Sequence, residues 1–220
     1  ALFIQSTSLA QTGVQPPTTY TVVTDRNPRP KPALPAMGPA GSKITDPTFG
    51  TRIVRVTDAN TRPDRANRAF FSPSSSEQNS WNSDSTIFYV EGAGGEVIPY
   101  SFNTTTMTAS RMGDLNNGSG GFVLALGASP AFSYTDPKLI YGIGGSTDRS
   151  LLQYSFQTGA YTTLIDLDRV VPGLSGYTGD PSVSVNDRFC IYFGGQSQNQ
   201  HDRVIVWDKA TGAYSILNTA

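Results

Sequence analysis

The chain repeats one order of strands and turns three times, and this repetition constrains the fold more than any single motif. Each copy has a polar strand, a turn with an aspartate, an aromatic-rich strand, a Gly-Gly loop, a second apolar strand, a Thr-rich turn and a last strand. The turn aspartates Asp84, Asp136 and Asp187 are 52 and 51 residues apart. We expect each of them to accept hydrogen bonds from backbone amides of its own turn, a structural role. Four short strands in about 50 residues are typical of a β-propeller blade.

The content of each copy favours strands over helices. The apolar segments alternate or run continuously over a few residues, Asn, Asp and Thr-Gly signals separate them, and no stripe with a 3.6-residue period persists. The composition agrees, because 22 Gly and 15 Pro suit short strands and turns. We therefore predict an all-β fold with three four-stranded propeller blades, at about 76–112, 129–166 and 181–218.

Three blades do not close a ring, since propellers use roughly four to eight. The visible blades are therefore a partial ring or a half-ring, and two explanations stay open. Either the chain is the N-terminal part of a longer protein, or two half-rings pair as a six-bladed dimer. We favour the first, because residues 214–220 stop at the end of a strand. Residues 52–57, which are rich in β-branched side chains, would then be the outer strand of a ring-closing last blade.

The first 50 residues differ from the repeats in composition. Residues 1–11 resemble the end of a secretory signal, with Ser8-Leu9-Ala10 as a cleavage site before Gln11. Residues 12–50 are dominated by Pro, Thr and small residues, which bury too little apolar area to fold, so we predict a linker. The propeller part then spans 51–220, and we expect the protein to be secreted, periplasmic or on the cell surface.

Charge and hydropathy exclude several partners. Lys and Arg total 16 against 17 Asp and Glu, which gives no general attraction for nucleic acid or for an anionic membrane. No apolar run reaches the length of about 18 residues that a membrane-spanning helix needs, so no membrane insertion is expected. The single cysteine, Cys190, lies in an apolar segment and is predicted to be a buried hydrophobe. No nucleotide, metal or nucleophile motif is present, so no cofactor is expected.

In a propeller blade with strands A to D, the B-C loops and the connections from D to the next A share the face that usually carries the ligand site. The B-C loops predicted from the repeat are residues 91–96, 144–149 and 194–202. The D-A connections are residues 58–76, 111–123 and 168–179. At the start of the three inner strands, the equivalent residues are Glu77, Ser129 and Asp180.

Two of these positions are carboxylates, so Glu77 and Asp180 are candidates for a ligand site. Paired carboxylates suit general acid-base chemistry on a glycosidic bond, or a cation, because one can be held protonated while the other is ionised. Hydration, or pairing with a neighbouring arginine, is the alternative that we favour. We therefore assign no catalytic residue.

Arginines and one histidine complete the candidates for ligand binding. Arg62, Arg65 and Arg68 could clamp an acidic sugar or a phosphate, but such arginines more often fasten a long loop to their own protein. Arg149 lies at the end of the second B-C loop. His201 lies in a hydrophilic loop, where it is either solvated or hydrogen-bonded to a carbohydrate, and one histidine alone makes no metal site.

Residues 78–88, Gln-Asn-Ser-Trp-Asn-Ser-Asp-Ser-Thr-Ile-Phe, resemble blades of TolB-like propellers and of oligogalacturonate lyase propellers. In those blades a strand that ends in Trp-Asn-x-Asp-Gly precedes an apolar strand, and in this chain Ser85 stands in place of the glycine. Residues 46–57 resemble the entry segment of the same proteins, so the resemblance covers residues 46–218 and implies the propeller fold. The lyase activity would need a manganese site built largely from histidines. Because His201 is the only histidine, no catalytic role is carried over.

These observations leave three functions open. The leading one is an extracytoplasmic propeller that binds a protein or a glycan through its loop face without catalysis. The second is the N-terminal part of a carbohydrate-active enzyme, a polysaccharide lyase or a glycoside hydrolase, with its catalytic groups in other blades. The third is a structural unit whose exposed blade edges pair with other copies, which would make it a homo-oligomer.

Overall fold

The computed structural model describes much of the chain from residue 24 onward, with the backbone alone described at 189–193. The described residues are 24–28, 30, 33, 35–47, 50–62, 69–71, 79–112, 124–127, 129–144, 149–170, 181–193 and 203–218. The chain divides into two units, residues 1–34 and 35–220. All the described strands belong to the second unit.

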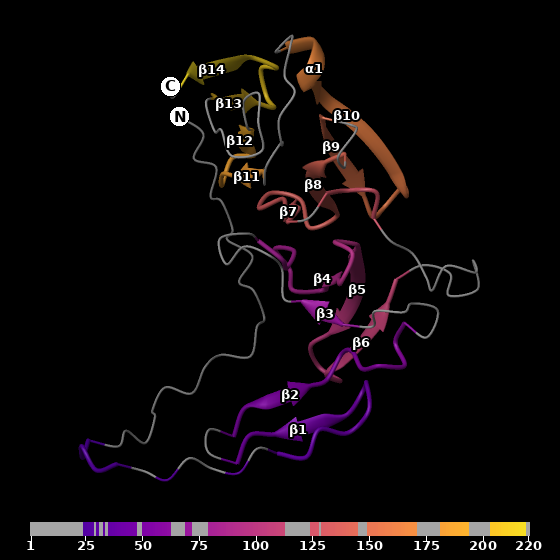
Figure 1. The fold of residues 1–220 in the computed structure, drawn as a ribbon, viewed down its shortest axis with the longest axis vertical. Helices are drawn as coiled ribbons and strands as arrows, with labels where there is room; N and C mark the ends of the chain where they lie inside the picture. Colours follow the sequence, from indigo (N-terminus) through magenta and orange to yellow (C-terminus); the bar gives the residue numbers. More distant parts are fainter. Residues whose placement is uncertain are drawn as a thin grey trace, which may run out of the picture. The chain divides into compact units, whose positions relative to one another are not determined.

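Three four-stranded antiparallel sheets form most of the second unit, and the strands of each follow the order of the sequence (Figure 1). The first sheet contains β3 (Phe70–Phe71), β4 (Ile87–Gly92), β5 (Val97–Asn103) and β6 (Thr108–Arg111). The second contains β7 (Ala131–Phe132), β8 (Leu139–Ile143), β9 (Ser150–Ser155) and β10 (Ala160–Asp166). The third contains β11 (Ser182–Val183), β12 (Arg188–Phe193), β13 (Arg203–Asp208) and β14 (Tyr214–Asn218). The all-β class is confirmed, and none of the described sheets closes on itself.

Turn residues explain why the last two strands of each sheet reverse so tightly. Gly159 and Gly212 take φ values of 69° and 66° in the turns before β10 and β14, a region that glycine enters without steric cost. The same turn of the first sheet uses Met107 at φ 52°. Asn103 supports that turn, because its Oδ1 accepts hydrogen bonds from the backbone of residues 105 and 106.

The strand register makes the three sheets equivalent residue by residue. The second residue of the second strand pairs with an aromatic residue on the third strand: Phe88 with Tyr100, Ile140 with Tyr154, and Phe189 with Trp207. On its other side, this second residue pairs with the innermost strand of its own sheet: Phe88 with Trp81, Ile140 with Phe132, and Phe189 with Val183. In the first sheet this innermost pairing is an isolated bridge, and β3 pairs further along β4.

Two apolar cores join neighbouring sheets. The core between the first two sheets is formed by Ile87, Tyr89 and Val97 on one side and by Phe132, Ile140, Leu152 and Tyr154 on the other. The core between the second and third sheets is formed by Tyr141, Ile143 and Leu151 on one side and by Ile205 and Trp207 on the other. Because successive side chains of a strand point to opposite faces, the second sheet contributes one face to each core. Burial of each such side chain is worth about 1.5–3 kcal/mol.

A smaller sheet precedes these three. It pairs β1 (Lys43–Thr45) with β2 (Arg52–Val54), so the linker predicted to reach residue 50 ends earlier, and the strand predicted at 52–57 is shorter. Lys43 Nζ donates a hydrogen bond of 2.6 Å to the Thr106 carbonyl, and Val56 packs against the cluster of Phe88, Ile98 and Tyr100. These contacts attach the β1–β2 pair to the first sheet.

A short helix, α1 (Leu167–Val170), follows β10 and buries Leu167 in the core between the second and third sheets. Asp166 caps it, because its Oδ1 accepts from the Arg169 backbone at 3.2 Å. Within the described parts of the chain, no helix combines the length and apolar character needed to cross a membrane.

Candidate functional site

Three contacts join the end of a second strand, or the turn that follows it, to the connections that lead into innermost strands. These contacts are Glu96 with Arg62, Glu91 with Ser129, and Arg149 with Asp168. The six residues define one end of the first and second sheets, which we call the loop end.

Arg62 is buried, with 2% of its side chain exposed, and forms a bidentate ion pair with Glu96. Its Nη2 donates to Glu96 Oε1 at 2.7 Å and its Nη1 to Oε2 at 3.2 Å. The guanidinium passes so close to Gly92 that a Cβ there would lie 2.0 Å from Arg62 Nη1. Glu96 Oε2 also accepts from the Gly94 backbone at 2.9 Å. The hydrogen bonds from Arg62 lower the pKa of Glu96 to about 2.

This geometry fits a structural task for Arg62. Its terminal nitrogens are engaged by a carboxylate of the same chain, and diverting them to a ligand would leave Glu96 without its cationic partner. Of the two roles considered for this arginine, the fastening of a long loop is therefore the one that fits. Arg149 makes a similar contact, because its Nη1 lies 2.9 Å from Asp168 Oδ1 in α1.

A buried carboxylate and a buried serine meet at the same end of the sheets. Glu91, near the end of β4, is almost fully buried, and its Oε1 accepts from the Ser129 backbone at 3.0 Å. Ser129 is completely buried, its φ is 61°, and its Oγ has no hydrogen-bond partner. The following residue, Pro130, accepts a hydrogen bond of 2.7 Å from the Tyr89 hydroxyl through its carbonyl. The serine is thus held on both sides by the first sheet.

The positive φ of Ser129 and its buried hydroxyl without a partner both lower the stability of the fold. A non-glycine residue in the left-handed region costs about 1–2 kcal/mol, and a buried hydroxyl without a partner costs about 1–3 kcal/mol. Strain and unsatisfied groups of this kind are concentrated at functional sites. The Ser129 hydroxyl can both donate and accept, so it has the chemistry to bind a hydroxyl or an amide group.

Several residues predicted for ligand binding lie outside the described residues, namely Glu77, Asp180, His201, Arg65 and Arg68. Ser129, which is equivalent in the repeat to Glu77 and Asp180, is described and contacts Glu91. In the part of the chain that the structure describes, no group of His, Cys, Asp and Glu side chains could hold a metal ion.

Sequence reasoning placed residues 91–96 in a loop and did not single out Glu91. The comparison of the three copies nevertheless contained a signal that could have identified Glu91. Glu91 is the cross-strand partner of Val97, and the equivalent partners of Leu151 and Val204 are Ile143 and Tyr192. A carboxylate at a position where the other copies carry large apolar or aromatic residues marks a place where the repeat departs from core packing.

A second buried polar cluster, also missed, joins the second and third sheets. Asp187 accepts hydrogen bonds from Ser133 Oγ at 3.1 Å, from Tyr141 OH at 3.3 Å and from Thr135 Oγ1. Lys209 Nζ lies 3.9 Å from Asp187 and donates to Tyr141 OH at 2.7 Å. Burial, and then the Asp187 carboxylate, raise the pKa of Tyr141 above its ordinary value. Because these groups satisfy one another, we interpret the cluster as a clamp between sheets, the Asp187 clamp.

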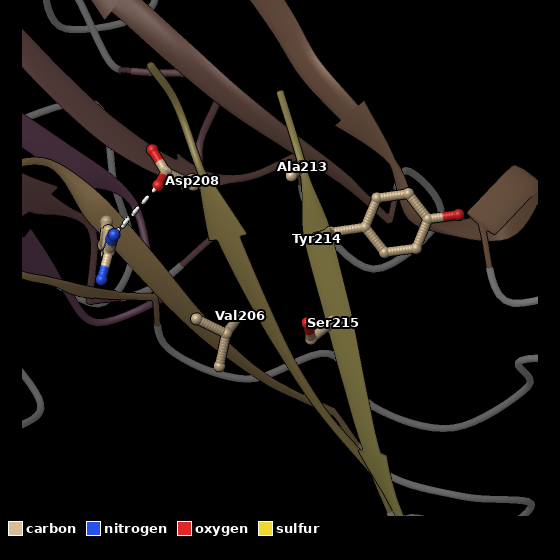
Figure 2. Close-up of a pocket in the computed structure, with 6 residues that line it drawn as sticks. Val206, Asp208, Ala213, Tyr214 and Ser215 are labelled. Carbon is tan, nitrogen blue, oxygen red and sulfur yellow. Dashed lines mark hydrogen bonds and ion pairs between the residues drawn. The ribbon is translucent and has the colours of Figure 1, made fainter. Parts of the chain in front are cut away.

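An open hollow of about 260 Å³ lies on the third sheet, on the face opposite to the core that contains Ile205 and Trp207. It is lined by Arg188, Val206, Asp208, Ala213, Tyr214 and Ser215. Figure 2 shows Val206 and Ser215 on neighbouring strands, with the ring of Tyr214 extending away from Val206. The charged groups pair with each other, since Arg188 Nη2 lies 3.2 Å from Asp208 Oδ2. The hollow therefore offers no enclosed site for a small ligand.

No protein-family model matches this chain, and a search of the curated proteins finds no match either. Function therefore has to be inferred from the residues and their geometry.

Proposed function

We propose that the three sheets are consecutive blades of a β-propeller that binds a glycan through the loop end, without catalysing a reaction on it. Three features support the propeller: the repeat of about 50 residues, the order of the strands, and the apolar cores that join sheet to sheet. The resemblance of residues 78–88 to TolB-like and oligogalacturonate lyase propellers supports the same architecture.

The observation that carries the ligand site is the buried, unpaired hydroxyl of Ser129. In propellers the loops at one end surround the ligand, and Ser129 lies at that end, before the innermost strand of the second sheet. A sugar hydroxyl would supply the missing partner of Ser129 Oγ. Glycans present many hydroxyls that both donate and accept, which is what the serine hydroxyl requires.

An extracytoplasmic location is consistent with this function. Residues 1–11 resemble the end of a secretory signal, and export would bring the site into contact with polysaccharides of a cell surface or of the surroundings. A nearly neutral charge balance, with 16 basic and 17 acidic residues, suits a neutral glycan better than a highly charged one.

A glycan array probed with the purified chain tests this proposal. We expect binding to a small set of related glycans, and Ser129→Gly should weaken that binding by at least about tenfold. Glycine keeps the left-handed backbone without strain, so a lost signal reports the hydroxyl and not misfolding.

Ser101→Ala is the matched control, because Ser101 is exposed on the first sheet and its hydroxyl bonds only to the Ser110 carbonyl among the described contacts. It should bind as the unmodified chain does. A flat signal across all glycans, or unchanged binding by Ser129→Gly, would refute the proposed site.

A further inference from the structure

The innermost strand of the first sheet carries an exposed aromatic side chain at the loop end. β3 pairs with the last residues of β4, and Phe71 lies opposite Glu91. Phe71 is 56% exposed, whereas its neighbour Phe70 is partly buried against the cluster that contains Phe88. Because successive residues of a strand point to opposite faces, the two phenylalanines lie on different faces of the sheet.

The face on which Phe71 lies is the one that packs on the second sheet. Glu91 pairs on its other side with Val97, which is completely buried in the core between the first two sheets. Directly opposite residues of an antiparallel pair have their side chains on the same side of the sheet, so Phe71, Glu91 and Val97 share this face. A sheet that follows the third one would not pack here, because the second sheet already occupies this face. The exposure of Phe71 is therefore a property of the first two sheets themselves.

Phe71 and Ser129 flank the same carboxylate. The Cβ atoms of directly opposite residues are about 4.5–5.5 Å apart, so the side chain of Phe71 starts beside that of Glu91. Glu91 Oε1 in turn accepts from the Ser129 backbone at 3.0 Å. An exposed aromatic ring and a buried hydroxyl without a partner are thus neighbouring features of the loop end.

A sugar is held by contacts to its ring faces as well as by hydrogen bonds. Because Ser129 Oγ is buried, a sugar that brings one hydroxyl to it must rest the remainder of its ring on exposed surface. Pyranoses such as β-linked glucose and xylose carry their hydroxyls around the rim and C–H bonds on their faces. The π face of an aromatic ring is negative and attracts such C–H hydrogens, and it also buries their apolar area.

We propose that Phe71 is the stacking platform of the glycan site, and that the ligand is a glycan of β-linked glucose or xylose units. This inference rests on the proposed function, because it names the class of sugar that the loop end binds. The phenylalanine side chain has no polar group, so it selects the C–H face of a sugar, while Ser129 selects one hydroxyl at the rim. Apolar contact combined with a few placed polar groups is the usual composition of a small-ligand site.

Isothermal titration calorimetry of the full chain with cellohexaose and with xylohexaose tests the platform. We expect at least one of these hexasaccharides to bind, and Phe71→Ala should weaken that binding by at least about tenfold. Phe71→Trp should bind at least as tightly, because its larger ring keeps the stacking surface. Phe71→Leu keeps an apolar side chain beside Glu91 but has no π face, so it should lose about fivefold.

Tyr134→Ala serves as the control, since Tyr134 is 47% exposed in the turn between β7 and β8, at the opposite end of the second sheet from the loop end. It should bind as the unmodified chain does, and urea unfolding verifies that every variant is folded. Unchanged binding by Phe71→Leu, while Ser129→Gly binds weakly, would overturn the platform and leave the proposed function standing. A chain that binds other glycans on the array but neither hexasaccharide would overturn the sugar class, and a flat array would refute the function as well.

Discussion

Asp187 lies in the turn that leads into β12, and its position within that turn determines its role. Its φ of 58° matches the 59° of Ser85 in the first sheet. By this criterion Asp187 is the equivalent of Ser85, and Asn186 takes the place of Asp84. Asp84 and Asp136 accept hydrogen bonds from local turn amides, as expected. The same role expected for Asp187 is wrong, because its carboxylate faces the hydroxyls of the second sheet.

The Arg62–Glu96 pair leads to a prediction about pH. The folded state lowers the pKa of Glu96 from 4.5 to about 2, so the pair contributes stability that is fully present above pH 4.5 and is lost as the pH falls toward 2. Glu96→Gln should lower the free energy of unfolding by about 2 kcal/mol at pH 7, because it leaves Arg62 buried without its anion. Urea unfolding at pH 7, 4 and 2.5 measures the difference, which should shrink as the pH falls.

The control for this prediction is Asp168→Asn. The Arg149–Asp168 pair is more exposed than the Arg62–Glu96 pair, so its loss should change stability by no more than about 0.5 kcal/mol. A Glu96→Gln variant whose deficit stays constant from pH 7 to 2.5 would contradict the assigned pKa.

At the scale of elements, the packing of sheet on sheet combines an apolar core with a polar contact. The second and third sheets share the core around Trp207 and also the Asp187 clamp. The polar contacts between the first two sheets include hydrogen bonds of 2.9 Å from Asn82 Nδ2 to the Pro137 carbonyl and of 2.7 Å from the Tyr89 hydroxyl to the Pro130 carbonyl. Polar groups buried between sheets must find partners across the junction, so they select one relative placement of the two sheets.

Removal of the clamp carboxylate should therefore weaken the third sheet's attachment. Asp187→Ala leaves the hydroxyls of Ser133 and Tyr141 without their acceptor and separates Lys209 from its anion. We expect a loss of about 3 kcal/mol in the free energy of unfolding. Asp84→Ala, which removes an exposed turn acceptor, should cost about 1 kcal/mol or less. Equal effects of the two substitutions in urea unfolding would argue against the clamp.

At the scale of the whole molecule, the division at residue 34 predicts how the chain tolerates truncation. Removal of residues 1–34 should leave the urea midpoint of the remainder unchanged, because those residues form a separate unit. Removal of residues 1–57 also deletes the β1–β2 pair, the Lys43 hydrogen bond and the Val56 contact. We expect that larger truncation to cost about 2 kcal/mol. A destabilised 35–220 chain would show that the first unit supports the second.

The parts of the fold that could be predicted are those that depend on residues close together in the sequence. The strands around Phe88, Tyr141 and Val204 were predicted, because alternation and turn residues act over a few positions. The shortened linker was missed, because the strand Lys43–Thr45 exists only by pairing with Arg52–Val54. The β-strand propensities of residues in a Pro-rich segment do not predict such a pairing.

The candidate site was less accessible to sequence reasoning. Arg62 was singled out, but its partner Glu96 lies 34 residues away, and Glu91 lies 38 residues from Ser129. Which of several carboxylates a guanidinium meets depends on how one loop folds over another. The positive φ of Ser129 also has no sequence signal, since serine rarely adopts it.

By itself, the sequence determined that this protein is built from strands, in three copies of a four-stranded unit, because hydrophobic alternation and turn chemistry are local properties. Only the tertiary structure decided which charges are paired and which buried hydroxyls stay without a partner. The physical reason is that burial and ion pairing depend on distances between residues far apart in the chain, and those distances exist only once sheet has packed on sheet.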